Sequence, residues 1–303
     1  MQQPQRLGNQ NRLPGLFASP LWYNLIMEIS GRVLAQRIQE ELVKDINMLK
    51  KRGVKPKLAI VTLGPENSWI AYVSQKIKLG KKLGVDTMVI NLTPATESDL
   101  LDTIKKLNID RSVHGIIVQR PMPIQINKEN IVNAIDFEKD VDGFKINSKY
   151  KVPAWLAVEE IIKQALRVPT EAKLRNSLLN QAILILGKGE TAGMPVIREL
   201  RSLGLTPIIV DSKTKNKNEL LKHADIIITA VGKRVVQKEN LKSGVILIGI
   251  GIQREDGKLI GDYDENDIKD IVSFYTPTPG GVGPLNLSYL FKNLVVAAKN
   301  QTT

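Results

Sequence analysis

The chain has 303 residues, no cysteine, two histidines and a formal net charge of +12. The lack of cysteine excludes disulfides, thiolate metal sites and cysteine nucleophiles, and two histidines are too few for a multi-histidine metal centre, so we expect no metal. No apolar run reaches the roughly 20 residues of a membrane span, and the basic residues are scattered rather than gathered with aromatics. We expect a cytoplasmic, two-domain protein that binds small anionic ligands rather than nucleic acid or a membrane.

Residues 1–27 contain no acidic residue, carry Arg6 and Arg12, and are rich in Gln, Asn and Pro. We expect a disordered extension, with Met27 as the functional first residue, because helical patterning begins directly after it. An organellar targeting peptide is the alternative, since such peptides are acid-poor and contain arginine. The segment is poor in serine and has no clear amphipathic period, which disfavours that alternative.

The first half alternates apolar runs with helical patterns, which predicts a βαβαβ unit and a parallel sheet. Buried strands are expected over residues 57–64, 86–92 and 113–119, with helices over 68–84 and 96–107. Ser68 and Thr96 are the expected helix N-caps, and Gly84 is the expected C-terminal stop.

The second half repeats the alternation. Strands are expected over residues 182–187, 207–210, 224–232 and 245–251, and helices near 158–166, 194–203, 218–222 and 285–300. We predict a catalytic domain over 28–148, completed by the final helix within 284–303, and a Rossmann-like dinucleotide-binding domain over 149–283. The fold class is therefore α/β, and we expect the last helix to return to the first domain.

The stretch "AILILGKGETAGMP" (182–195) passes from an apolar strand through Gly187, Gly189 and Gly193 into a helix. Bare backbone at such a turn lets a pyrophosphate approach a helix N-terminus. The spacing is one residue longer than G-x-G-x-x-G, so an ordinary strand-to-helix turn remains an alternative.

Tyr72 and Lys76 lie four residues apart on an expected helix and therefore on one face. A partly desolvated lysine beside a phenol can act as a general acid or base, although such a pair is more often surface decoration. A Tyr-x-x-x-Lys pair also occurs in short-chain dehydrogenases, but there it lies downstream of the glycine turn, whereas here it lies upstream.

The strand over 113–119 should bring Gln119 to the carboxyl edge of the sheet, where α/β proteins bind ligands. Asp140 and Asp142 follow in "DVDG", where either could hold a metal or cap a turn. A free carboxylate there could instead accept two hydrogen bonds from the ring N–H and amino group of a heterocycle.

In order along the chain, "YVSQK", "VHGIIVQRPMP", "NAIDFEKDVDGF", "GKGETAGMP", "ADIIITAVGK", "GIGIQREDGKLIGD" and "TPTPGGVGP" resemble the bifunctional methylenetetrahydrofolate dehydrogenase/cyclohydrolase family. The resemblance runs from about Glu28 to the C-terminus. It implies oxidation of 5,10-methylenetetrahydrofolate with NAD or NADP and hydrolysis to 10-formyltetrahydrofolate, in one-carbon metabolism and purine biosynthesis. It also implies a homodimer.

The resemblance assigns roles by matching position. Lys76 is the central acid or base, Tyr72 stacks on the folate, Gln119 tunes Lys76, and Asp142 anchors the pterin. The remaining substrate-binding residues are Val118, Pro279, Gly280 and Gly281. The cofactor-binding residues are Gly187, Lys188, Gly189, Gly193, Asp211, Ser212, Lys213, Val231, Gly232 and Ile252.

The choice between NAD and NADP depends on Asp211, 24 residues after Gly187. A carboxylate there accepts hydrogen bonds from a free ribose 2′-hydroxyl and repels a 2′-phosphate, which favours NAD. Lys188, Ser212 and Lys213 could still neutralise a phosphate. Lys188-Gly189 replaces the family's Arg-Ser, so a cyclohydrolase alone, or a non-catalytic folate-binding paralogue with a degenerate cofactor site, is the alternative function. A third possibility is another two-domain nicotinamide dehydrogenase with an unrelated substrate.

Overall fold

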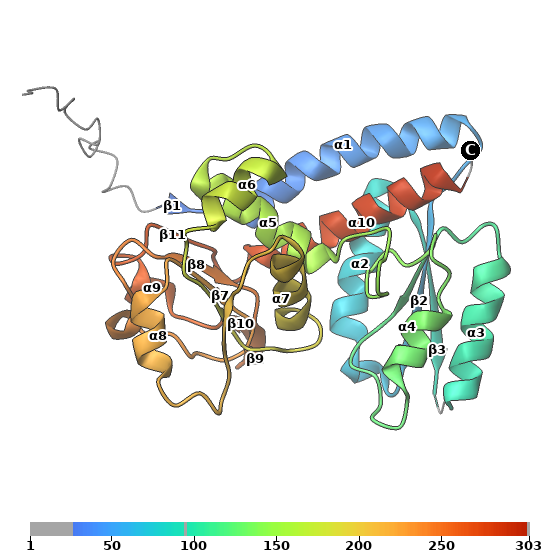
Figure 1. The fold of residues 1–303 in the computed structure, drawn as a ribbon. Helices are drawn as coiled ribbons and strands as arrows, with labels where there is room; N and C mark the ends of the chain where they lie inside the picture. Colours follow the sequence, from blue (N-terminus) through green and yellow to red (C-terminus); the bar gives the residue numbers. More distant parts are fainter. Residues whose placement is uncertain (1–26, 94–95, 302–303) are drawn as a thin grey trace, which may run out of the picture.

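A computed structural model of the chain describes residues 27–93 and 96–301. These residues form two α/β lobes, each built on a parallel sheet (Figure 1). Residues 1–26 of the expected extension lie outside the described residues. The two-domain α/β prediction is confirmed.

The first lobe contains a three-stranded parallel sheet in the order β3-β2-β4. Its strands are β2 (Lys57–Leu63), β3 (Asp86–Leu92) and β4 (Gly115–Val118), and its connecting helices are α2 (Ile70–Leu83) and α3 (Glu97–Ile109). Strand β2 is central and almost entirely buried, whereas β3 lies at the sheet edge and is only half-buried. The prediction of a buried strand is therefore right for β2 and β4 and wrong for β3.

The helix ends show how local chemistry positions these elements. Thr96 and Asp99 form a reciprocal capping box at the start of α3, and Gly84 ends α2 in the left-handed conformation. Ser68 is not a cap. It lies in the short 3₁₀ helix η2 (Glu66–Ser68), where its hydroxyl donates to the Pro65 carbonyl at 2.7 Å, so Trp69 occupies the N-cap position of α2.

The second lobe is a six-stranded parallel sheet in the order β1-β11-β8-β7-β5-β6. The four expected strands are present as β5 (Ile183–Leu186), β6 (Ile208–Val210), β7 (Ile226–Thr229) and β8 (Ile246–Gly249), with helices α7 (Gly193–Ser202) and α8 (Lys217–His223). Strand β5 lies between β6 and β7. The strands that follow β5 are therefore added on opposite sides of it. The glycine turn after β5 lies at this switch point, where such folds bind ligands.

Two long helices connect the lobes. Strand β1 (Met27–Glu28) pairs with β11 (Phe274–Tyr275), so the first described residues extend the second sheet rather than the first. Helix α1 (Gly31–Lys51) then crosses to the first lobe beside α10 (Val282–Asn300), and α10 also packs on α5 (Pro153–Leu166) (Figure 1). One apolar core runs through these helices from lobe to lobe.

Several short elements were not expected from the sequence. They are α4 (Lys128–Ala134), η3 (Lys238–Asn240), the hairpin β9 (Ile252–Glu255) and β10 (Lys258–Gly261), and α9 (Glu265–Ile268), whereas α6 (Glu171–Leu178) lies in a stretch with a helical pattern. Most have four to eight residues, too few to display a clear hydrophobic period. Among the described helices, none combines the length and apolarity needed to cross a membrane.

Candidate functional site

Helix α2 and the end of β4 bring Lys76 and Gln119 together. The Lys76 ammonium donates to Gln119 Oε1 at 2.8 Å, and Gln119 Nε2 donates to the Arg120 carbonyl at 2.8 Å. The second bond fixes the orientation of the amide, so that its oxygen faces the lysine. Burial lowers the pKa of Lys76, and the negative charge of Asp142 opposes this shift. Lys76 therefore gives up its proton more readily than an exposed lysine does.

Tyr72 lies one turn before Lys76 on α2, with 52% of its surface exposed. An exposed aromatic ring beside a desolvated lysine offers a face on which a flat substrate can stack.

The two aspartates of "DVDG" have different surroundings. Asp140 is buried and accepts backbone hydrogen bonds from Phe144 at 3.3 Å and Lys145 at 3.1 Å, so it caps the turn. Asp142 is half-buried. Burial raises the pKa of Asp142, the positive charge of Lys76 opposes the rise, and Asp140 adds to it. No group of three metal-ligating side chains occurs within the described residues.

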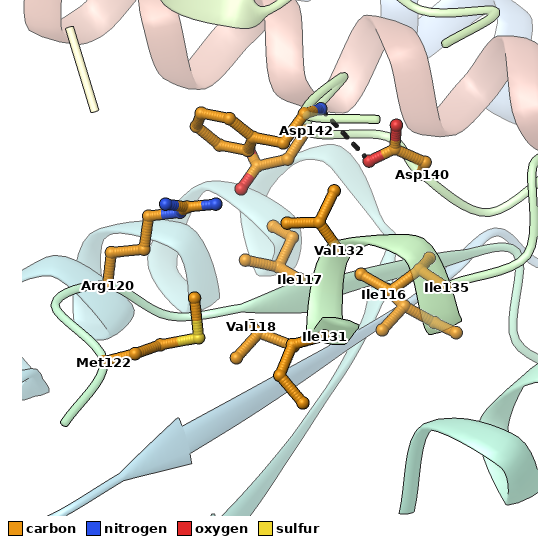
Figure 2. A pocket seen from close by; sticks show the side chains of 11 residues that line it. Ile116, Ile117, Val118, Arg120, Met122, Ile131, Val132, Ile135, Asp140 and Asp142 are labelled. Carbon is orange, nitrogen blue, oxygen red and sulfur yellow. Dashed lines mark hydrogen bonds between the residues drawn. The ribbon is translucent and has the colours of Figure 1, made fainter. Parts of the chain in front are cut away.

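A small cavity opens beside Asp142 (Figure 2). Its polar wall is formed by Arg120, Asp140 and Asp142, with the Phe144 ring beside them. The remaining lining is apolar: Ile116, Ile117, Val118, Met122, Ile131, Val132 and Ile135. Of the predicted substrate-binding residues, Val118 and Asp142 line this cavity, whereas Tyr72, Gln119, Pro279, Gly280 and Gly281 do not.

The loop with Pro279, Gly280 and Gly281 packs against the start of α1. Arg32 N–H donates to the Gly280 carbonyl at 3.0 Å, and a Cβ on Gly31 would lie 1.8 Å from the Gly281 carbonyl oxygen. Gly280 has a φ of 122°, which only glycine adopts readily. The loop is thus fixed by backbone contacts that leave no room for larger side chains.

The glycine turn after β5 needs two of its three glycines. A Cβ on Gly187 would lie 2.7 Å from the Ala230 carbonyl oxygen, and one on Gly193 would lie 2.1 Å from the Gly187 carbonyl oxygen. At Gly189 the nearest atom would be 3.9 Å away. Bare backbone is therefore packed tightly at the N-terminus of α7, which fits the cradle that a dinucleotide pyrophosphate requires.

Asp262 organises the two loops that carry the other predicted cofactor residues. It is fully buried and accepts backbone hydrogen bonds from Gly232 at 2.6 Å, Lys233 at 3.1 Å and Gly251 at 3.1 Å. Val231 and Ile252, next to these donors, remain exposed. Sequence reasoning missed Asp262, although it ends the motif "GIGIQREDGKLIGD". The available signal in the sequence was an aspartate directly after Gly261, at the end of that motif.

Lys188 and Asp211 form an ion pair at 2.8 Å between the glycine turn and the end of β6. Asp211 also accepts the Lys213 N–H at 2.9 Å. The hydrogen bond from Lys188, followed by that from Lys213, lowers the pKa of Asp211 to about 2, so this carboxylate is ionised at neutral pH. Ser212 and Lys213 are exposed beside it. The structure therefore brings these four predicted cofactor residues together.

Comparisons with known proteins agree with this geometry. Residues 29–142 match the family described as "Tetrahydrofolate dehydrogenase/cyclohydrolase, catalytic domain", and residues 170–302 match its "NAD(P)-binding domain". The bifunctional protein FolD of Listeria innocua is 36% identical over 283 residues, covering 89% of this chain and 96% of that protein.

Solved structures are similar over the same extent. The bifunctional FolD dehydrogenase/cyclohydrolase of Campylobacter jejuni has a TM-score of 0.82 and 32% identity, covering 91% of this chain and 99% of that one. The Trypanosoma brucei FolD, solved with NADP and an inhibitor, has a TM-score of 0.81 and 27% identity, covering 91% and 98%.

Proposed function

This chain belongs to the tetrahydrofolate dehydrogenase/cyclohydrolase family, and from this premise we propose that it catalyses both reactions of that family's name. It oxidises 5,10-methylenetetrahydrofolate to the methenyl compound with a nicotinamide cofactor and hydrolyses the product to 10-formyltetrahydrofolate. The observation that carries the proposal is the bond between Lys76 and Gln119, in a half-buried position within the electrostatic reach of Asp142.

In the proposed hydrolysis, Lys76 handles the protons. Water adds to the methenyl carbon and loses a proton to neutral Lys76. The resulting ammonium returns a proton to the folate nitrogen as its bond to that carbon breaks, and the remaining hydroxyl proton leaves to solvent as the formyl C=O forms. Gln119 supplies the acceptor that holds the ammonium in place. Because burial lowers the lysine pKa, the neutral form that accepts this proton is easier to reach than in an exposed lysine.

The other substrate residues hold the folate. Tyr72 would stack on the flat ring system, and Asp142 would accept hydrogen bonds from the pterin, a pairing that a carboxylate makes with two adjacent N–H groups. Val118 and the loop of Pro279, Gly280 and Gly281 would close around the ring system. Burial of Asp142 supports this role, since a desolvated carboxylate gains more from such a partner than an exposed one.

The cofactor, when bound, accepts the hydride. The residues that would hold it are backbone groups of Gly187, Gly189 and Gly193 at the turn, with Val231 and Gly232 after β7 and Ile252 at the start of β9. The lack of space for side chains at Gly187 and Gly193 supports this placement.

We propose that NAD is preferred over NADP. Lys188 is already paired with Asp211, and an ionised Asp211 would repel a ribose 2′-phosphate while accepting a free 2′-hydroxyl. Ser212 and Lys213 are the groups that could offset this repulsion. The ratio of kcat/KM with NAD to that with NADP tests the preference, and a ratio below one contradicts it.

One assay series tests the two activities. Purified protein is mixed with methylenetetrahydrofolate and either dinucleotide while methenyl absorbance is followed, and hydrolysis of added methenyl compound is measured separately. We expect both activities. Hydrolysis without oxidation by either dinucleotide would leave a cyclohydrolase alone, and absence of both would leave a folate-binding paralogue.

We also propose a cytoplasmic homodimer serving one-carbon metabolism and purine biosynthesis. The cysteine-free composition suits a reducing compartment, and the dimer is proposed from the family. Sedimentation of the purified chain and fractionation of cells expressing it test these points; a monomer, or recovery in an organelle, contradicts the corresponding one.

A further inference from the structure

Charged side chains join the glycine turn to the first lobe. Glu190, within the turn, forms ion pairs with Arg120 and with Lys128, the latter at 2.6 Å. Only 10% of the Arg120 side chain is exposed. A second link comes from α7, the helix that follows the turn, where Arg198 Nη2 donates to the Gly143 carbonyl at 2.8 Å. The turn and α7 thus contact the first lobe at two points, one of them directly after Asp142.

Arg120 stands at the centre of the first lobe's polar cluster. Its guanidinium lies over the Phe144 ring, 4.1 Å from the centroid, and lines the cavity with Asp142 (Figure 2). Its backbone carbonyl accepts the bond that orients Gln119, whose oxygen in turn faces Lys76. Contacts therefore run without a break from the glycine turn to the catalytic lysine.

The charges along this path affect Asp142. The charged groups that face Asp142 are Lys76 from α2, Asp140 from its own loop and Arg120. Arg120 in turn faces the carboxylate of Glu190. Since opposite charges offset each other's field, Glu190 reduces the positive potential that Arg120 presents to Asp142.

We propose that Arg120 and Glu190 are positioning residues that couple the cofactor turn to the folate pocket, so that a dinucleotide and a folate each strengthen the binding of the other. An anionic pyrophosphate at the turn repels the Glu190 carboxylate toward Arg120. The tightened pair holds Arg120, and with it the Gln119 amide and the wall beside Asp142, in the arrangement that accepts a folate. This inference rests on the proposed function and adds two residues that the family resemblance does not assign.

The first test is a binding cycle on the full chain. Calorimetric affinity for tetrahydrofolate is measured with and without saturating NAD, and again with NADP, for the wild type, Arg120→Gln, Glu190→Gln and the double variant. We expect the dinucleotide to tighten folate binding by about fivefold or more in the wild type. Each single variant should reduce the factor to below about twofold, with no further loss in the double variant.

Lys128→Gln is the matched control because it removes the other partner of the same carboxylate. Lys128 is 43% exposed and lies outside the path to Gln119, so the wild-type coupling should persist. Thermal unfolding of every variant establishes that it is folded, and Arg120→Lys, which keeps the charge, serves if Arg120→Gln does not fold. Its coupling should lie between those of the wild type and Glu190→Gln.

The second test is the pH at which acidification weakens tetrahydrofolate binding. Arg120→Gln removes a positive charge near Asp142, raises the pKa of that carboxyl and moves the midpoint to higher pH. Glu190→Gln removes the negative charge that offsets Arg120. Asp142 then meets a more positive potential, its pKa falls, and the midpoint moves to lower pH. A purely structural role would weaken binding in both variants without these opposite shifts.

Coupling that persists in both single variants, an uncoupled wild type, or midpoints that move in the same direction would overturn the inference. Failure of the proposed function looks different, because a wild type that binds folate and dinucleotide yet oxidises nothing would refute the dehydrogenase activity and leave the binding cycle intact.

Discussion

The two lobes use charged side chains in opposite ways. In the first lobe, Lys76, Asp142 and Arg120 are withdrawn from water, and their pKa values shift accordingly. In the second, bare backbone forms the turn, Lys188 and Asp211 pair near the surface, and the buried carboxylate of Asp262 is occupied by backbone N–H groups. Moving protons requires desolvated, titratable groups, whereas holding a dinucleotide requires backbone in a fixed shape.

If the first lobe supplies the proton chemistry, Lys76→Met should have the largest effect. We expect hydrolysis of the methenyl compound to fall by about 10²- to 10⁴-fold, the usual contribution of a general acid or base. Calorimetric affinity for tetrahydrofolate should change little, since Asp142 and Tyr72 remain. Lys78→Met, an exposed lysine on the same helix, is the control. Hydrolysis at the wild-type rate in Lys76→Met would remove the assigned role.

If the second lobe works through backbone shape, Gly193→Ala should damage it and Gly189→Ala should not. The new methyl at position 193 would meet the Gly187 carbonyl at 2.1 Å, whereas the one at 189 would meet nothing closer than 3.9 Å. We expect dinucleotide affinity to fall about tenfold to a hundredfold for Gly193→Ala, corresponding to an overpacking cost of about 1–3 kcal/mol. Equal affinities in the two variants, measured by fluorescence of bound NADH, would contradict this account.

Asp262→Asn tests whether one carboxylate organises the cofactor loops. Asparagine replaces an acceptor oxygen with an amide that faces the N–H groups of Gly232 and Lys233. We expect the free energy of unfolding to fall by about 1–3 kcal/mol, the cost of buried unsatisfied groups, and dinucleotide affinity to weaken, while hydrolysis persists. Asp256→Asn, at an exposed hairpin position, is the control. If both variants unfold at the same denaturant concentration as the wild type, Asp262 is dispensable for stability.

The sequence predicted the fold well where elements are long or where their ends carry capping or helix-terminating residues. Buried strands β2, β5, β7 and β8 are continuous apolar runs, and Thr96 and Gly84 mark helix ends by their own chemistry. Ser68 is not the cap because it is the last residue of the 3₁₀ helix η2, which leaves Trp69 at the N-cap position of α2. Strand β1 could not be predicted, because two residues show no period and their pairing with β11 spans almost the whole chain.

The candidate site divides in the same way. Lys76 with Tyr72, and the glycine turn, follow local spacing that can be read along the chain. Arg120, Glu190 and Asp262 carry no such pattern, since each acquires its role from a partner distant in sequence. Gly189 is the opposite case. Its place in the motif suggested that only glycine fits there, but the surrounding space would accept a side chain.

The smallest effect expected concerns the surface pair of the second lobe. Asp211→Ser removes the carboxylate that would repel a 2′-phosphate and releases Lys188 from its 2.8 Å ion pair, so both changes favour NADP. Because solvent screens charges near the surface, we expect the ratio of kcat/KM for NAD over NADP to fall by no more than about tenfold. Asp225→Ser removes another surface carboxylate paired with a lysine, Lys242, and should leave the ratio unchanged. Hydrolysis by the first lobe should be unaffected in both variants. A ratio that stays constant in Asp211→Ser would mean that groups other than Asp211 select the cofactor. The second lobe would then bind the dinucleotide through the shape of its backbone, with no contribution from this surface ion pair.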